Sequence, residues 1–166
     1  MSIENIEREK FNFNIDTATE DDLKQIDEID NRPEEHAEML KLQKEGAGKL
    51  FVVRHGDRIA GYVFIYYNHQ SAHFPEMQAP FLEDLMVHPD FRGKGLGEVL
   101  LQKCEEEIQN QGGKKLTFAV LASNKQAVDF YTKNGYIEMP GTEFEPPKQE
   151  NQDEREVGYY FKKELT

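Results

Sequence analysis

The stretch that decides the fold spans residues 82–97 and reads LEDLMVHPDFRGKGLG. Its first part continues an apolar run at 81–87 that is typical of a strand, and Pro89 stops that strand. A turn with three glycines at alternate positions follows, and a helical pattern of apolar residues at four-residue spacing runs from Leu96 to about Gln111. The stretch therefore predicts a strand that passes through a glycine turn directly into a helix.

The glycine turn has the properties of an anion site. Glycines at 93, 95 and 97 let backbone N–H groups point together, and a helix start adds its positive dipole end. Arg92 and Lys94 add positive charge, so a pyrophosphate is the expected ligand. The Walker spacing is absent, and the Rossmann spacing needs a glycine where Leu100 stands. A glycine-rich helix start without a ligand is the alternative that this turn alone leaves open.

The rest of the chain predicts one domain, residues 1–166, with no repeats and no linker. Residues 1–10 form a polar lead-in, and residues 142–156 form a polar loop that we expect to be mobile. We expect helices at 19–29, 33–45, 96–111 and 123–134, with Ser123 and Gln126 as a capping box. The expected strands are 11–15, 50–54, 59–67, 81–87, 116–121, 136–139 and 157–161, with a polar loop at 68–79. An antiparallel hairpin region comes first, and the order strand-helix-strand-helix-strand follows. This order predicts one α/β layered domain.

Composition narrows the class of protein further. The 166 residues carry a formal charge of −12, which disfavours nucleic acid and anionic membranes as partners and favours cations such as amines. A solubility role alone also explains such a charge. The single cysteine, Cys104, excludes an internal disulfide and falls on the apolar stripe of a helix, where a core position is expected. Without a signal peptide or a long apolar run, a cytoplasmic location is expected.

Two linked motifs resemble the GNAT superfamily of acetyltransferases. The first is Arg92-x-x-Gly95-x-Gly97, and the second is Asn124-x-x-Ala127-x-x-Phe130-Tyr131-x-x-x-Gly135-Tyr136. The resemblance covers roughly residues 52–161. It implies a single-domain α/β fold, with a central mixed, mostly antiparallel twisted sheet flanked by helices on both faces. The segment Leu82-Glu83-Asp84, followed by Arg92-Gly93, is also similar to spermidine/spermine N-acetyltransferases.

The resemblance implies acetyl-CoA as cosubstrate, no metal, and a set of contacts. Main-chain groups of Leu85, Met86 and Val87 would hold the pantetheine arm. Arg92, Gly93, Lys94, Gly95, Leu96 and Gly97 would hold the pyrophosphate. Asn124 would bond the pantetheine or lie beside the thioester.

The chemistry of the transfer needs an acid and a base. An alkyl amine is protonated at neutral pH and must lose a proton before it attacks, whereas the departing thiolate gains one. The resemblance implies Tyr131 as the acid, with a core aromatic as the alternative. It implies Glu83 as the base, directly or through water, with a structural carboxylate as the alternative. Strand alternation predicts Glu83, Leu85 and Val87 on one face and Leu82, Asp84 and Met86 on the other, and leaves the role of Asp84 open.

The expected function is transfer of acetyl to a primary amine of a small cationic acceptor that resembles a polyamine, an aminoglycoside or lysine. A protein N-terminal or lysine acetyltransferase is one alternative, and a sensor that binds acetyl-CoA without turnover is another. His69 and His73 lie in an expected loop, so they do not predict a metal pair. A homodimer is an assembly that the resemblance suggests, with the excursion near Pro146-Pro147 as the part that would reach a neighbour.

Overall fold

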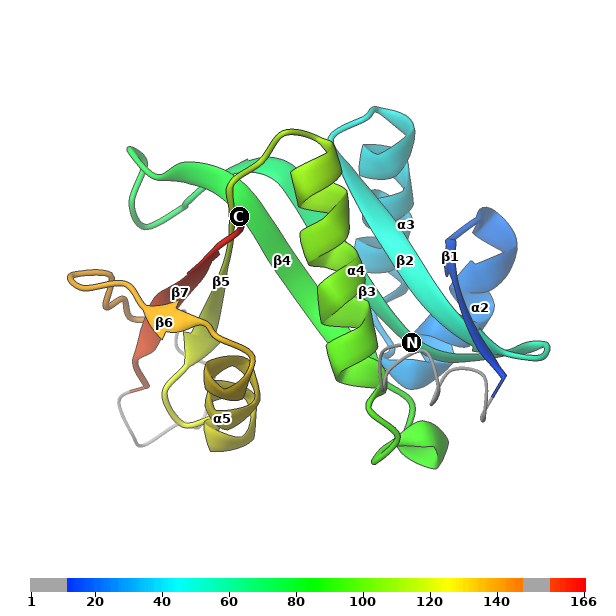
Figure 1. Ribbon diagram of the computed structural model, residues 1–166. Coiled ribbons are helices and arrows are strands. Elements are labelled where there is room, and N and C mark those ends of the chain that lie inside the picture. Colours follow the sequence, from blue (N-terminus) through cyan, green and yellow to red (C-terminus); the bar gives the residue numbers. More distant parts are fainter. Residues whose placement is uncertain (1–11, 148–155) are drawn as a thin grey trace.

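The computed structural model describes residues 12–147 and 156–166. Seven strands form one sheet in the order β1-β2-β3-β4-β5-β7-β6 (Figure 1). The strands are β1 (Phe13–Thr17), β2 (Gly48–His55), β3 (Arg58–Gln70), β4 (Gln78–Val87), β5 (Lys115–Leu121), β6 (Ile137–Glu138) and β7 (Gly158–Glu164). The helices are α2 (Leu23–Ile29), α3 (Pro33–Lys44), α4 (Leu96–Asn110) and α5 (Lys125–Lys133), with short 3₁₀ turns at Glu20–Asp22 and Pro89–Phe91. The expected mixed, mostly antiparallel sheet is confirmed.

Helices cover both faces of the sheet, as expected. One apolar core lies under α4 and α5 and includes Leu82, Leu100, Phe118 and Tyr131. A second core lies under α2 and α3 on the opposite face. Figure 1 shows α4 and α5 in front of the sheet and α2 and α3 behind it. Within the described residues, no helix is long and apolar enough to cross a membrane.

The sheet opens between its two central strands. β4 and β5 run parallel and share the aligned pair Phe81↔Thr117 at the start of β4. β5 instead pairs with β7 along its whole length, and Figure 1 shows β4 and β5 diverging below their point of contact. Beyond Phe81, the β4 edge that faces β5 therefore has no strand partner among the described residues, and an extended group that is not part of the sheet could pair with it.

A β-bulge in β4 overturns the predicted alternation of side chains. Tyr62 aligns with Met86 and Phe64 with Glu83, so one residue of β3 faces two of β4. Asp84 takes the left-handed φ of 54° at this point. Beyond the bulge, Leu85 and Val87 pack with Leu82 on the α4 side, whereas Met86 packs on the α3 side. Glu83 does not share a face with Leu85, contrary to the strict alternation of a regular strand.

Several element boundaries differ from the sequence prediction for local reasons. Gly46, at φ 79°, ends α3, but Gly48 belongs to β2. β3 and β4 extend further than expected, which shortens the loop between them to residues 71–77. Asn124, not Ser123, caps α5, because its side chain accepts the Ala127 N–H at 3.2 Å.

The loop before β7 is packed where it is described. Phe144 forms an antiparallel bridge with Gly158, and the hydroxyl of buried Thr142 donates to the Met139 carbonyl at 2.6 Å. The expected mobility of 142–156 stays a prediction, with Thr142 and Phe144 held by these contacts. Residues 148–155 lie outside the described chain, as do the polar lead-in 1–10 and the expected first strand residue, Phe11.

Candidate active site

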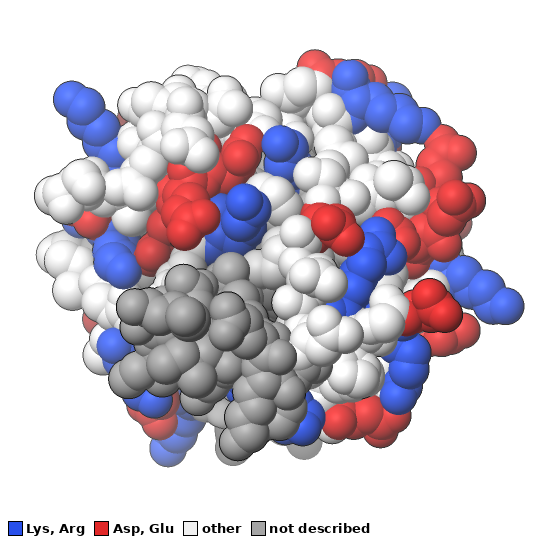
Figure 2. All heavy atoms as spheres, turned by 45° about the vertical axis from the view of Figure 1, so that its right-hand side comes forward, with Lys and Arg blue, Asp and Glu red and all other residues white. Residues whose placement is uncertain are grey.

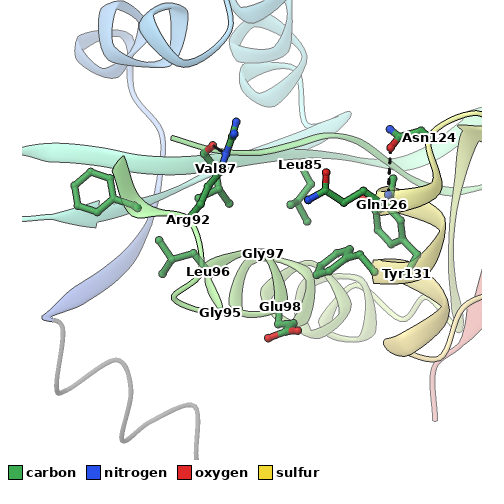
Figure 3. A pocket seen from close by; sticks show the side chains of 14 residues that line it. Leu85, Val87, Arg92, Gly95, Leu96, Gly97, Glu98, Asn124, Gln126 and Tyr131 are labelled. Carbon is green, nitrogen blue, oxygen red and sulfur yellow. Dashed lines mark hydrogen bonds between the residues drawn. The ribbon is translucent and has the colours of Figure 1, made fainter. Parts of the chain in front are cut away.

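A cavity of about 580 Å³ lies where β4, α4 and α5 meet. Figure 3 shows the turn before α4 at one end, α5 at the other, and the side chains of β4 between them. The lining residues come from all three parts: Leu85, Val87, Phe91, Arg92, Gly93, Gly95, Leu96, Gly97, Glu98, Asn124, Gln126, Ala127, Phe130 and Tyr131. The two motifs singled out in the sequence thus line one cavity.

The glycine turn has the backbone geometry that an anion site needs. Gly93 and Gly95 take left-handed φ values of 77° and 75°, and Gly95 is the N-cap of α4. The first N–H groups of an α-helix have no intrahelical acceptor, so those of Leu96 to Glu98 remain available at the cavity. A Cβ on Gly97 would lie 3.3 Å from the Phe130 ring, so a larger residue here would require that ring to shift by a few tenths of an ångström.

The floor of the cavity is the open edge of β4. Leu85 and Val87 line it with their side chains, and β4 is bonded to β3 along its other edge. Arg92 folds back over the strand, and its Nε donates to the Val87 carbonyl at 3.4 Å. Figure 3 shows Arg92 directly beside Val87. An extended arm with amide groups would fit along this edge as an added strand.

Tyr131 is the ionisable side chain at the α5 end of the cavity. The residue is 9% exposed, and its ring packs against Phe118 with 3.9 Å between centroids and a tilt of 32°. Its hydroxyl has no hydrogen-bond partner among the described residues. It is also not buried from solvent, because Asp84 Oδ2 is the one side-chain atom of those residues that is both buried and without a hydrogen bond. The hydroxyl therefore opens into the cavity. Burial raises the pKa of Tyr131, with the neighbouring Cys104 and Asp84 adding to the effect, so the phenol stays protonated at neutral pH.

Glu83 lies in a second cavity, on the opposite side of β4. This cavity has a volume of about 290 Å³ and is lined by Glu34, Glu35, Glu38, Met39, Leu42, Tyr66 and Glu83. We call it the acidic pocket. Burial raises the pKa of Glu83, and the charge of Asp84 raises it further, whereas hydrogen bonding by Tyr66 opposes the rise. A carboxylate with a raised pKa is suited to accept a proton near neutral pH.

Asp84 separates the two cavities at the bulge. Its Oδ2 lies 2.6 Å from Nη2 of Arg32, a contact of opposite charges whose angles do not make it a hydrogen bond.

Tyr66 is an ionisable group of the acidic pocket that is not a carboxylate. Burial and the charge of Glu83 raise the pKa of Tyr66 to about 12, so its phenol is neutral. The acidic pocket thus presents carboxylates and one neutral hydroxyl.

The structure also places the other residues that the sequence singled out. The Met86 side chain packs on the α3 side, so a cofactor contact from Met86 is left to its backbone. Lys94 does not line the cavity. His69 packs at a tilt against Phe81 and His73 stacks on Phe144, so the two rings have separate partners. Within the described residues, no group of three or more His, Cys, Asp or Glu is arranged to hold a metal. Cys104 is fully buried, as expected.

The sequence reasoning missed the walls of the acidic pocket and part of the larger cavity. Tyr66 lies on β3, which pairs with the strand of Glu83, whereas the three glutamates of α3 meet Glu83 only through the packing of α3 against the sheet. Their spacing on a helix start reads as a solvated acidic turn, so no local signal marked them. Gln126 and Glu98 line the larger cavity from positions that flank the motif residues, and the motif spacing pointed to neither.

Comparison with known proteins decides the family. The profile described as the Acetyltransferase (GNAT) family matches residues 5–136. The chain belongs to the GNAT family of acetyltransferases. A solved Salmonella typhimurium acetyltransferase with its cofactor acetyl-CoA shares this fold, with a TM-score of 0.73, 16% identity and coverage of 93% of this chain and 94% of that one.

Two curated relatives carry the same description, thialysine N-epsilon-acetyltransferase. The Bos taurus protein is 31% identical over 88 residues, which is 53% of this chain and 50% of the relative. The Caenorhabditis elegans protein is 29% identical over 143 residues, which is 80% of this chain and 88% of the relative. The match therefore spans about half of the cattle protein and most of the nematode one. Within the GNAT family, these relatives support the local similarity that the Leu82-Glu83-Asp84 segment suggested.

Proposed function

We propose that this chain transfers the acetyl group of acetyl-CoA directly to a primary amine of a small cationic acceptor. The observation that carries the proposal is the pair of cavities on opposite sides of the β4 bulge. One has the anion-binding turn and Tyr131, and the other has Glu83 among carboxylates.

The larger cavity fits the chemical groups of coenzyme A. The turn at Gly93 and Gly95 and the start of α4 would hold the pyrophosphate through main-chain N–H groups. The open edge of β4 at Leu85 and Val87 would bond the amides of the pantetheine arm. When bound, the thioester supplies an activated acetyl group, so no acetylated side chain is required.

The ionisable residues of the two cavities divide the proton transfers. Glu83 accepts the proton of the acceptor ammonium, directly or through water, and thereby frees the lone pair that attacks the thioester carbon. Tyr131 stays protonated and its hydroxyl faces the donor cavity, so it gives its proton to the departing sulfur as the C–S bond breaks. The acylated nitrogen then loses its second proton to solvent, and solvent returns a proton to the Tyr131 phenol. The acid and the base approach the same bulge from opposite faces of β4.

Charge supports a cationic acceptor. Glu35 is paired with Arg32, whereas Glu34, Glu38 and Glu83 have no ion-pair partner among the described residues. Figure 2, in which the right-hand side of Figure 1 comes forward, shows acidic side chains along the right-hand edge of the molecule, with Lys and Arg side chains among them. Carboxylates around a narrow pocket attract ammonium groups and raise their local concentration. The curated relatives are described as acting on thialysine, which is an amine.

The test is thiol release from acetyl-CoA with and without a panel of amines, with products identified by mass spectrometry. The panel includes a monoamine, a diamine, a lysine analogue and a peptide with a free N-terminus. We expect the small amines with a second positive charge to give the highest kcat/KM. Release that depends on the peptide alone would favour a protein acetyltransferase, and binding without amine-stimulated release would favour a sensor.

A further inference from the structure

Arg32 joins the segment between α2 and α3 to the bulge of β4. Its Nε donates to Asp30 Oδ2 at 2.6 Å, its Nη1 bonds Glu35, and its Nη2 lies 2.6 Å from Asp84 Oδ2. Arg32 directly precedes Pro33, the first residue of α3, so its backbone is restricted. One guanidinium thus holds three carboxylates from two layers of the fold.

A buried chain of polar groups supports Arg32 from behind. The Tyr62 hydroxyl lies 3.5 Å from Arg32 Nη2 and 3.0 Å from His36 Nε2, and His36 Nδ1 lies 2.5 Å from Asp27 Oδ1. Tyr62 and His36 are both 0% exposed. A fully bonded buried polar chain rigidifies the groups that belong to it. The Tyr62 hydroxyl at the end of this chain therefore offers the guanidinium a fixed contact.

The other end of the contact is a strained position. Asp84 has φ 54°, which L-residues rarely adopt, and its Oδ2 is sealed from solvent without a hydrogen bond. A carboxylate oxygen that is sealed from solvent needs a counter-charge, and Arg32 supplies it. Glu83, on one side of Asp84, lines the acidic pocket, and Leu85, on the other side, lines the larger cavity. The contact that fixes Asp84 therefore also fixes which cavity the side chains of Glu83 and Leu85 enter.

We infer that Arg32 is a positioning residue for acetyl transfer, because its grip on the Asp84 carboxylate fixes the bulge that presents Glu83 to the acceptor. The inference rests on the proposed function, in which Glu83 is the base. Its geometric part, the hold on the bulge, stands on the contacts alone.

Charge gives the inference a second readout. The groups that face Glu83 are Asp84 on β4, Tyr66 on β3, Arg32, and the α3 glutamates 34, 35 and 38. Arg32 is the cation among them, and its charge lowers the pKa of Glu83 against the effects of burial and of Asp84. Loss of the Arg32 charge is expected to raise the pKa of Glu83, and a general loss of stability would not.

The test compares Arg32→Gln and Arg32→Lys with the matched control Arg54→Gln. Arg54 also binds two carboxylates, Asp16 and Asp22, and its side chain is 26% exposed against 29% for Arg32. It is not part of either cavity. Two readouts are used: the pH profile of kcat/KM, and NMR of the Asp84 ¹³Cα and ¹³Cβ shifts with titration of the Glu83 carboxyl. The NMR readout needs no activity.

Arg32→Gln is expected to change the ¹³C chemical shifts of Asp84. It should also move the acid limb of the kcat/KM profile to higher pH, by about one pH unit. Arg32→Lys keeps the charge but cannot bridge three carboxylates, so the limb stays while kcat falls on the order of tenfold or more. The control Arg54→Gln should leave both the Asp84 shifts and the acid limb of the profile unchanged.

The inference would be overturned if both Arg32 variants kept the Asp84 chemical shifts and the Glu83 titration of the parent. It would also be overturned if Arg54→Gln changed these two readouts as much as the Arg32 variants do. If Arg32→Gln does not fold, Arg32→Lys decides the geometric part alone. Failure of the parent to release thiol with any amine would defeat the proposed function instead, and the NMR shifts would still decide whether Arg32 holds the bulge.

Discussion

Glu83 and Leu85 lie on opposite faces of β4, although only Asp84 separates them. Glu83 lines the acidic pocket under α3, and Leu85 lines the larger cavity under α4 and α5. The extra residue at the bulge causes this, because it shifts the strand by one position against β3. Donor and acceptor can therefore reach the same point of the sheet from opposite sides.

Tyr131→Phe is expected to lower kcat by roughly a hundredfold, because the variant loses the proton donor for the sulfur. Acetyl-CoA binding and the free energy of unfolding should change little, since the hydroxyl has no bonded partner among the described residues. Steady-state kinetics and thermal unfolding measure both. Tyr136→Phe is the control: Tyr136 is also buried, at 1% exposed against 9% for Tyr131, but its hydroxyl donates to Glu105 of α4 at 3.2 Å. Equal loss of kcat in both variants would show that Tyr131 acts through packing.

Glu83→Gln is expected to remove the acid limb of the pH profile of kcat/KM. In the parent, the base is active when ionised, so activity falls as the pH drops through the pKa of Glu83. Burial, aided by Asp84, places that pKa above the usual 4.5. Glu38→Gln is the control, because Glu38 lines the same pocket without adjoining the bulge. It should raise KM for the amine and keep the limb. A Glu83→Gln profile that coincides with the parent would rule out Glu83 as the base.

Gly93→Ala is expected to weaken acetyl-CoA binding. Gly93 has φ 77°, and a left-handed alanine costs about 1 kcal/mol of stability. Relief of that strain would rotate the N–H groups of the turn away from the ligand. Gly46→Ala is the control, because Gly46 has φ 79° and equally open surroundings at the end of α3. Both variants should lose similar stability in urea unfolding, but only Gly93→Ala should lose affinity in calorimetry. Equal affinities would argue against the turn as the phosphate site.

Asp22 is expected to make the stability of the fold depend on pH. Burial opposes ionisation of Asp22, but hydrogen bonds from Arg54 at 2.8 Å and from the Thr19 N–H outweigh it and lower the pKa. A lowered pKa contributes stability above the unfolded value, and this is lost as the pH falls through the folded value. The free energy of unfolding of Asp22→Asn at neutral pH should therefore be about 2 kcal/mol lower than that of the parent. The difference should shrink below about pH 4 in urea unfolding. A constant difference would contradict the assignment.

The sequence supports the donor side of the site better than the acceptor side. Residues 92–97 and 124–131 carry local backbone requirements, such as left-handed glycines and a helix cap, and such requirements leave motifs with fixed spacing. The acidic pocket has no such motif, because α3 and Glu83 meet only through tertiary packing. The alternation rule failed at Asp84, since a bulge at a non-glycine residue leaves no mark in the pattern of apolar residues.

The central claim is that both substrates are bound at once, on the two sides of β4. Initial rates measured with acetyl-CoA varied at several fixed amine concentrations test it most directly. Direct transfer through a ternary complex predicts double-reciprocal lines that intersect, and no acetylated protein after incubation with acetyl-CoA alone. Parallel lines together with an acetylated protein would show a covalent intermediate and contradict the account.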